Sequence, residues 1–314
     1  MNRPRTMVAR VDEYLVARRR TGFDLRIAGR QLLSFGRFAD QAGHNGSLTF
    51  DVAVRWARSA RGGTRLTWAR RFEVLRPFAR YLMQFDANTA VIPSRFFGAA
   101  HRRLVPHIYT EHEIVDLLHA ANDLPPTGGL RPLMYQTLFG LLAATGLRLS
   151  EVLHLTVRDV EPDRLSVRQT KFRKSRLVPL QVSTARALAR YATARDRTIR
   201  GVHVETFFVS EGGNPLAART VESTFQTLRT QLGWVARGGH VWPRLHDLRH
   251  TFICHGLLRS YREGHPADHA IDALSTYVGH ARVSDTYWYV TATPELMAIA
   301  AQRFASMAAD GEAS

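Results

Sequence analysis

The first hundred residues alternate between amphipathic stretches and short polar breaks. Glycine-rich segments at 43–46 and 61–63 interrupt the pattern with residues typical of turns. On either side of these breaks, apolar side chains recur at the three- and four-residue spacing of helices. The stretches with this spacing are residues 8–20, 25–42, 51–60 and 65–83. They predict a small bundle of helical hairpins.

The pattern becomes irregular and basic over residues 93–108, where prolines and a glycine accompany Arg102 and Arg103. We expect this segment to be a basic linker. It separates a first, helical domain at residues 1–92 from a second domain at residues 109–314.

The second domain mixes helical spacing with short alternating runs. Thr110 and the two glutamates after it form an N-cap and an acidic first turn, which begin a helix. Residues 165–169 and 176–179 predict a β hairpin, and residues 207–210 a third strand. Further segments with helical spacing are 220–235, 245–260, 267–278 and 294–307. The expected fold class is therefore mainly α with small β hairpins, an α+β chain.

Composition narrows the class of partner. A length of 314 residues and a hydrophobic share of 45% are enough for two domains, each with its own core. The formal net charge is +16, and arginine is densest in the first hundred residues. Such a charge favours a polyanion as partner, with an affinity that falls as salt rises. The alternative is a solvated surface that binds nothing acidic.

Cys254 is the only cysteine, which excludes a disulfide within the chain. His250 lies four residues before it, but no second ligand pair has a recognised zinc spacing. We therefore expect no metal site and a small, buried Cys254. The polar, basic start of the chain is unlike a signal peptide, and no apolar run is long enough to span a bilayer. These features favour the reducing cytoplasm and exclude a membrane partner.

An ordered set of polar side chains extends over the second domain. Two arginines are able to grip a phosphate through planar forks of donors, and a histidine adds another donor. A lysine is able to protonate a leaving oxygen, and a tyrosine to act as nucleophile. The set predicts attack on a phosphodiester without a metal or other cofactor. Its members are Arg148, Lys171, His246, Arg249, His280 and Tyr289.

These residues lie in four recognisable segments: ATGLRLSE at 144–151, KFRKSRLVPL at 171–180, HDLRH at 246–250, and Gly279-His280 with Tyr289 nine positions later. In all of them the chain resembles the tyrosine recombinases, also called the phage integrase family. The resemblance extends over almost the whole chain. It implies a helical core-binding (SAM-like) domain followed by a catalytic domain.

The resemblance also implies the roles of the catalytic residues. Tyr289 would attack the scissile phosphate and form a 3′-phosphotyrosyl link, while Arg148 and Arg249 hold the non-bridging oxygens. His246 would donate to one of these oxygens, and His280 would orient or deprotonate the tyrosine. Supporting roles fall to Glu151, Asp247 and His250.

The only lysines of the chain are Lys171 and Lys174, both in the predicted hairpin. A general acid must release a proton, which an ammonium does far more readily than a guanidinium with a pKa above about 12. Lys171 has the spacing of the family's hairpin lysine, five residues before Arg176, and is assigned as the acid. Lys174 is expected to contact phosphate or solvent.

Two hydroxyls compete for the role of nucleophile, because Tyr287 lies two residues before Tyr289. The family's spacing from His280 selects Tyr289, and Tyr287 is expected to be a packing residue.

The expected partner is double-stranded DNA with inverted-repeat core sites, bound in the nucleoid by a homo-tetramer or by an assembly with related recombinases. The helix at 294–307 would dock into a neighbouring subunit, or else pack on its own domain. Candidates for contacts to DNA are Arg18, Arg19, Arg20, Arg70, Arg71, Arg102, Arg103 and Lys174.

The biological role follows from a narrower resemblance than the chemistry does. The segments around Tyr287 and after Thr293 resemble transposon-associated simple recombinases, which favours integration or excision of mobile DNA. The alternatives are a recombinase that resolves chromosome dimers, a type IB topoisomerase, and an inactive DNA-binding accessory protein.

Overall fold

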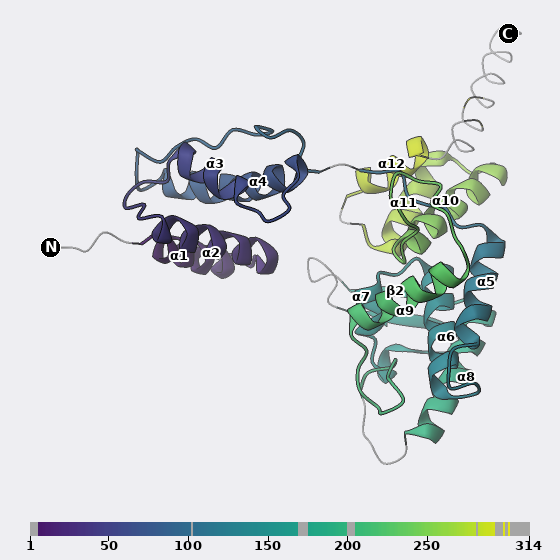
Figure 1. The fold of residues 1–314 in the computed structure, drawn as a ribbon. Coiled ribbons are helices and arrows are strands. Elements are labelled where there is room, and N and C mark those ends of the chain that lie inside the picture. The colour runs from purple at the N-terminus through teal and green to yellow at the C-terminus, as the bar shows by residue number, and fades with distance from the viewer. Residues whose placement is uncertain are drawn as a thin grey trace, which may run out of the picture. The chain divides into compact units, whose positions relative to one another are not determined.

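The computed structural model of this chain describes residues 6–101, 103–168, 175–199, 205–280 and 282–292, together with 298 and 301. The chain divides into two compact units, Met1–Arg103 and Leu104–Ser314, each with its own hydrophobic core. Helices dominate both units (Figure 1). Arg102, Lys171, Lys174 and most of the expected helix at 294–307 lie outside the described residues.

The N-terminal unit is a bundle of helices, each within two residues of its predicted bounds. Three of them begin at a threonine whose side chain accepts the backbone N–H three residues further on, at 3.2 to 3.4 Å. The four helices are α1 (Met7–Arg20), α2 (Arg26–Gln41), α3 (Phe50–Arg58) and α4 (Arg65–Leu82). Local caps and an apolar face thus specify this unit together.

Helices α1 and α2 cross closely in this bundle. A Cβ added at Gly36 would lie 3.0 Å from the Cα of Val8, so the crossing depends on a residue without a side chain. The core beneath is aromatic, with the rings of Phe35 and Trp56 5.4 Å apart and edge to face. Aromatic side chains thus fill the centre of this unit.

The predicted linker is irregular, but its ends pack into the units that flank it. Phe97 and Ala100 are buried in the N-terminal core, and the carbonyl of Ala100 accepts from Nε of Arg70 at 3.1 Å. At the other end, the side chain of His107 is 1% exposed within the second unit.

The C-terminal unit is mainly helical with a small antiparallel hairpin, in which Leu165 pairs with Val178. The predicted fold class is thereby confirmed. Its elements are α5 (Glu111–Asn122), α6 (Leu130–Thr145), α7 (Leu149–Leu153), the 3-10 helix η1 (Val157–Asp159), β1 (Arg164–Val167), β2 (Arg176–Pro179), α8 (Val182–Thr198), α9 (Ala218–Gln231), α10 (Asp247–Arg262), α11 (Ala267–Val278) and α12 (Ser284–Ala292).

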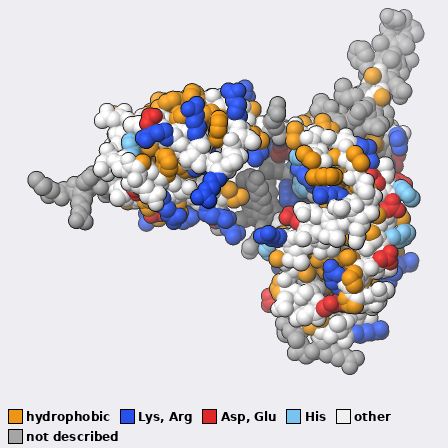
Figure 2. All heavy atoms as spheres, in the orientation of Figure 1, with side chains coloured by type: hydrophobic (Ala, Val, Ile, Leu, Met, Phe, Trp, Pro, Cys, Tyr) orange, Lys and Arg blue, Asp and Glu red, His pale blue; other side chains and the backbone are white. Residues whose placement is uncertain are grey.

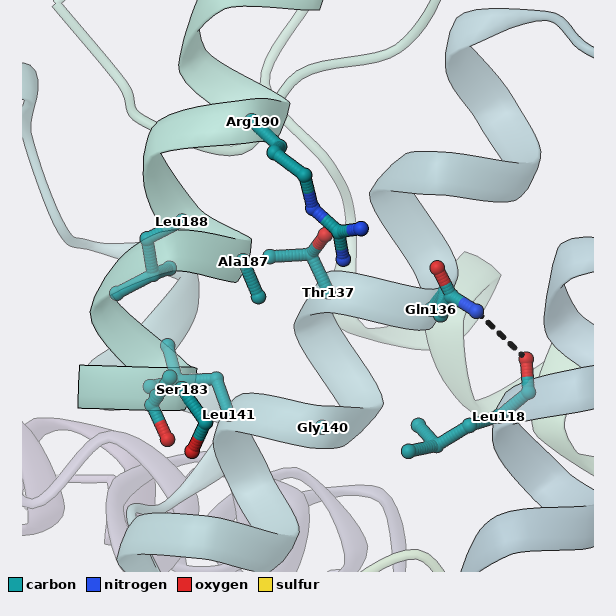
Figure 3. A pocket seen from close by; sticks show the side chains of 10 residues that line it. Leu118, Gln136, Thr137, Gly140, Leu141, Ser183, Ala187, Leu188 and Arg190 are labelled. Carbon is teal, nitrogen blue, oxygen red and sulfur yellow. Dashed lines mark hydrogen bonds between the residues drawn. The ribbon is translucent and has the colours of Figure 1, made fainter. Parts of the chain in front are cut away.

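Helix α6 lies at the centre of this unit and packs on α5, α8 and α10. Figure 3 shows a groove beside it, lined by Leu118 of α5, Gly140 of α6 and Ala187 of α8. Nε2 of Gln136 donates across the edge of the groove to the carbonyl of Leu118 at 3.5 Å. The apolar faces of α6 hold the turn that follows it, which carries Arg148.

The prediction of a strand at 207–210 is wrong. Val209 forms only an isolated bridge to Pro215, and its N–H donates to the hydroxyl of Tyr191 at 3.0 Å. The three apolar residues of this run are all buried as a core segment, so its apolar composition reflects burial and not pairing with a strand. Helix α9 also ends at Gln231, earlier than predicted, and Gly233 then adopts a φ of 65°.

Within the described residues, no helix combines the length and the apolar character needed to cross a membrane.

Candidate active site

Arg148 is positioned by a glycine turn between two helices. Gly146 ends α6 in the left-handed conformation, with φ 61°, and a Cβ there would lie 2.6 Å from the ring of Phe252. Arg148 follows as the N-cap residue of α7, with its side chain partly exposed. The turn therefore directs the guanidinium out of the core.

Glu151 joins two arginines from different elements. Its Oε1 lies 2.8 Å from Nη1 of Arg148, and its Oε2 lies 2.9 Å from Nη2 of Arg176 on β2. Burial opposes ionisation of this carboxyl, but hydrogen bonds from Arg176 and from the Arg148 backbone, with both positive charges, hold its pKa below the ordinary value. The ionised Glu151 fixes both side chains.

Arg249 of α10 is the most buried of the site's arginines, with 3% of its surface exposed. Its Nη1 donates to the carbonyl of Gly146 at 2.7 Å, and its Nη2 to that of Val278 at 2.8 Å. Burial, followed by the charge of Arg148, lowers its pKa to about 10, so it stays charged at neutral pH.

Three arginines donate hydrogen bonds to the carboxyl end of α11. Arg176, Arg249 and Arg148 donate to the consecutive carbonyls of Tyr277, Val278 and Gly279, at 2.8, 2.8 and 3.1 Å. The carbonyl end of a helix carries partial negative charge and attracts such cations. Gly279 must lack a side chain here, because its φ is 69° and a Cβ would lie 2.6 Å from the guanidinium of Arg176. Arg148, Arg176 and Arg249 thus form a cationic cluster at this helix end.

Sequence reasoning did not include Arg176 in the site. In the sequence, Arg176 is one of several basic residues in the hairpin segment at 171–180. Its shared carboxylate and its contact with α11 make it a member of the cluster. An arginine that begins a strand shortly after Lys171 was the available signal.

His246 precedes α10 and lies beside the arginine cluster. Its side chain is accessible to solvent. The surrounding protein removes water from the ring, and this desolvation lowers its pKa. The charges of Arg249 and Arg244 lower it further, which favours the neutral ring with one N–H donor. Asp247, fully buried, accepts from the backbone N–H of Arg244 at 2.8 Å and fixes the turn.

His280 follows α11 and contacts α12. Its Nδ1 is 2.7 Å from Oγ1 of Thr286, a residue with no exposed surface. Burial and then the charges of Arg249 and Arg148 lower its pKa to about 4. Its ring lies parallel to that of Tyr289, with a 6.2 Å separation and a 5° angle.

Tyr289 of α12 lies beside His250 and His280 and is 4% exposed. Its hydroxyl is 2.6 Å from Nδ1 of His250, and its charge, when ionised, would raise the pKa of Arg249. Tyr287 is different, and its expected packing role is wrong. Its side chain is 46% exposed and its hydroxyl donates to Oδ1 of Asp268 at 2.7 Å, because it lies on the outer face of α12.

The arginines proposed for DNA contacts in the N-terminal unit differ in their surroundings. Arg71 stacks over the ring of Trp56 at 4.2 Å, and burial lowers its pKa, so it belongs partly to the core. Arg18 lies 3.9 Å over Phe23. Arg19 and Arg20 are exposed, as is Arg70, and so is Arg103 in the segment before the second unit. Figure 2 shows basic side chains over both units on the face in view.

The site therefore combines fixed cations, neutral imidazoles and a tyrosine hydroxyl. Fixed donors of this kind stabilise negative charge that develops on a phosphate. These side chains come from four segments that are far apart in the sequence and that the fold brings together.

Residues 108–295 match the Phage integrase family. The chain is also similar to two Sinorhizobium fredii proteins named integrase/recombinase y4rB and y4rE. The first is 38% identical over 299 residues, covering 93% of this chain and 95% of the relative. The second is 35% identical over 296 residues, covering 94% of each chain. Tyrosine recombinase XerC of Bacillus subtilis is 28% identical and covers 76% of this chain and 74% of XerC.

Two solved structures share the fold. The Tn1549 transposon integrase in complex with circular intermediate DNA has a TM-score of 0.66 at 17% identity, covering 96% of this chain and 100% of the other. The XerH site-specific recombinase bound to a palindromic difH substrate has a TM-score of 0.65 at 16% identity, covering 92% and 82%.

Proposed function

Because this chain belongs to the phage integrase family and is a tyrosine-type recombinase, we propose that Tyr289 is its nucleophile and attacks a DNA phosphodiester. The observation that carries this proposal is the approach of the Tyr289 side chain to the same helix terminus as Arg148 and Arg249. Attack would give a 3′-phosphotyrosyl link and free a 5′ hydroxyl.

Arg148 and Arg249 hold the two non-bridging oxygens in this proposal. Both guanidiniums are fixed by protein carbonyls, so little reorganisation is needed when charge develops on the phosphate. His246, which is accessible from solvent, donates one further hydrogen bond. His280 orients the nucleophile through the parallel packing of its ring on Tyr289.

Lys171 is proposed as the general acid that protonates the leaving 5′ oxygen. The support is chemical and comes from the sequence, because the residue lies outside the described part of the chain. Arg176, five residues later, is anchored to Glu151 at 2.9 Å, so the chain after Lys171 returns to the site. Lys174 is proposed to contact DNA phosphate.

The finer role proposed is integration or excision of mobile DNA. Two relatives above 30% identity carry integrase/recombinase names, and one neighbour in fold is a transposon integrase. Resolution of chromosome dimers is the second candidate, because XerC is a more distant relative.

Double-stranded DNA with inverted-repeat core sites is the proposed partner. A lambda integrase dimer with the same fold is bound to a core site, and XerH to a palindromic one. A tetramer on two sites would supply the second strand for exchange. The N-terminal unit would be the core-binding domain, at residues 1–92, and its exposed arginines would contact phosphates inside the cell. Neither a metal nor ATP is required, because the phosphotyrosyl link conserves the energy of the phosphodiester.

Two steps test this function. The protein is first incubated with sheared host DNA, and fragments that stay attached after denaturation are sequenced to identify the site. Two duplexes that carry this site are then mixed with the protein. Recombined strands are expected with the wild type and not with Tyr289→Phe. Attachment without exchange, together with relaxation of a supercoiled plasmid, would instead identify a topoisomerase.

A further inference from the structure

The hydroxyl of Tyr289 forms a short hydrogen bond with a histidine that the mechanism above does not use. Nδ1 of His250 lies 2.6 Å from this hydroxyl, and the two ring centroids are 5.3 Å apart. The contact joins the first turns of α10 to α12, two helices that pack on each other. The charge of Arg249 acts on the His250 ring, so this contact lies near the proposed phosphate site.

The surroundings of His250 disfavour a positive charge on its ring. Burial lowers the pKa of its imidazole to about 3. Electrostatic repulsion contributes as well, and comes from His246, Arg244, Arg249 and His280. The ring is therefore neutral at physiological pH. In the tautomer with its proton on Nε2, Nδ1 accepts the hydrogen bond and the Tyr289 hydroxyl donates it.

We propose that His250 is a catalytic residue that takes the hydroxyl proton of Tyr289 as this oxygen attacks phosphorus. The proposal deepens the function above and rests on it. In this proposal the proton goes to His250, the histidine that contacts the reacting oxygen. The role of His280 is then to orient the tyrosine ring, since its own Nδ1 is hydrogen-bonded to Thr286 at 2.7 Å.

The step balances in atoms and charge. The bond between the tyrosine oxygen and phosphorus forms while the bond from phosphorus to the 5′ oxygen breaks. The phenol proton moves to Nδ1 of His250, and the leaving oxygen takes a proton from the proposed acid, Lys171. When a 5′ hydroxyl attacks the phosphotyrosine, both transfers reverse and the imidazolium returns its proton to Tyr289.

Binding of the substrate itself would make His250 a better base. Arg249 and Arg244 disfavour the protonated ring in the free protein. A phosphodiester bound to Arg249 adds negative charge next to the ring and offsets these cations. Proton transfer is therefore favoured when DNA occupies the site, which limits activation of the nucleophile in its absence.

The test compares His250→Ala with His250→Asn. Asn supplies a carbonyl oxygen close to the position of Nδ1, so it accepts a hydrogen bond but does not take up the proton. Single-turnover attachment is measured at saturating concentrations of a nicked duplex that carries the recovered site. Both variants are expected to slow attachment by about a hundredfold, the usual scale for a lost base, with unchanged DNA affinity. Free imidazole in solution should restore attachment to His250→Ala by occupying the vacated space.

A matched control is His255→Ala, which removes a partly buried histidine further along the same helix. It should attach at the wild-type rate. Wild-type attachment by His250→Asn would leave His250 only a hydrogen-bond role and overturn the proposal, as would failure of imidazole to rescue a folded His250→Ala. If the wild type itself forms no adduct, the proposed function fails first.

Discussion

At the scale of single residues, three arginines share one anchor. Arg148, Arg176 and Arg249 donate to three consecutive carbonyls at the end of α11, and Glu151 bridges two of them. Their directions are set by protein groups, so the cluster exists before a phosphate arrives. A binding site built in advance stabilises developing charge without first having to reorganise.

The sequence identified most of these residues, because short segments with fixed spacing carry them. It did not indicate the pairing of His250 with Tyr289, which depends on how α10 and α12 pack. It also misjudged Tyr287, since two tyrosines two positions apart leave opposite faces of a helix and a spacing alone does not say which face is buried.

We predict that Lys171→Ala slows cleavage of a normal phosphodiester by roughly a hundredfold, as expected when a general acid is lost. A substrate with sulfur at the bridging 5′ position leaves as a thiolate and needs no proton. Lys171→Ala should therefore recover on it, measured by single-turnover cleavage.

Arg148→Ala serves as the contrast, because it loses the grip on phosphate and should not recover on the sulfur substrate. Recovery by Lys174→Ala in place of Lys171→Ala would transfer the acid role to Lys174.

We predict that acid destabilises the protein from about pH 6.5 downward. The pKa values of His250 and His280 are about 3 and about 4 in the folded protein, against 6.5 ordinarily. Between these values the unfolded chain binds more protons, so stability falls as pH falls, and it is unaffected by these groups above 6.5. Melting temperatures at pH 8, 7, 6 and 5 measure this.

The melting temperature of His250→Asn should fall less over the same range, because its unfolded chain has one histidine fewer to take up a proton. A wild-type melting temperature that stays constant from pH 7 to pH 5 would contradict the prediction. Loss that begins only near pH 4.5 would point to carboxylates such as Glu151 instead.

At the scale of elements, the helices of the N-terminal unit were predicted well from their apolar stripes, including α2, which no side chain caps. The threonine caps of α1, α3 and α4 mark their starts within two residues. The apolar run at 207–210 misled the prediction, because a buried loop that plugs a core has the same composition as a buried strand. Packing in the core, which the sequence does not show, determines which of the two conformations forms.

The next element to test is the expected helix at 294–307, with its apolar side chains at Leu296, Met297, Ile299 and Phe304. We predict that deletion of the chain after Thr293 prevents stable pairing of two sites, because this stripe would no longer dock into a neighbour. Binding to one site should survive. Light scattering on paired sites gives the mass of each complex.

Full-length Tyr289→Phe is the control for assembly, since it keeps the helix and lacks only the hydroxyl. It should form the same complex as the wild type. Unchanged assembly by the truncated chain would show that the helix packs on its own subunit.

At the scale of the whole molecule, charge and division into two units agree with a protein that binds a long polyanion. Most of the net charge of +16 lies in the N-terminal unit, where arginine is densest, although Figure 2 shows basic side chains on the visible face of both units. Length and composition predicted two domains. The ends of the irregular segment between them proved to be packed, since buried side chains such as Phe97 and His107 are not distinguishable from linker residues by composition.

The central claim is that Tyr289 becomes covalently joined to DNA, and one measurement tests it most directly. Protein trapped on a nicked duplex with the recovered site is digested, and the peptide that carries the nucleotide is sequenced by mass spectrometry. We predict that the nucleotide lies on Tyr289, that Tyr287→Phe gives the same adduct, and that Tyr289→Phe binds the duplex but forms none. An adduct on another residue, or one that persists in Tyr289→Phe, would contradict the account.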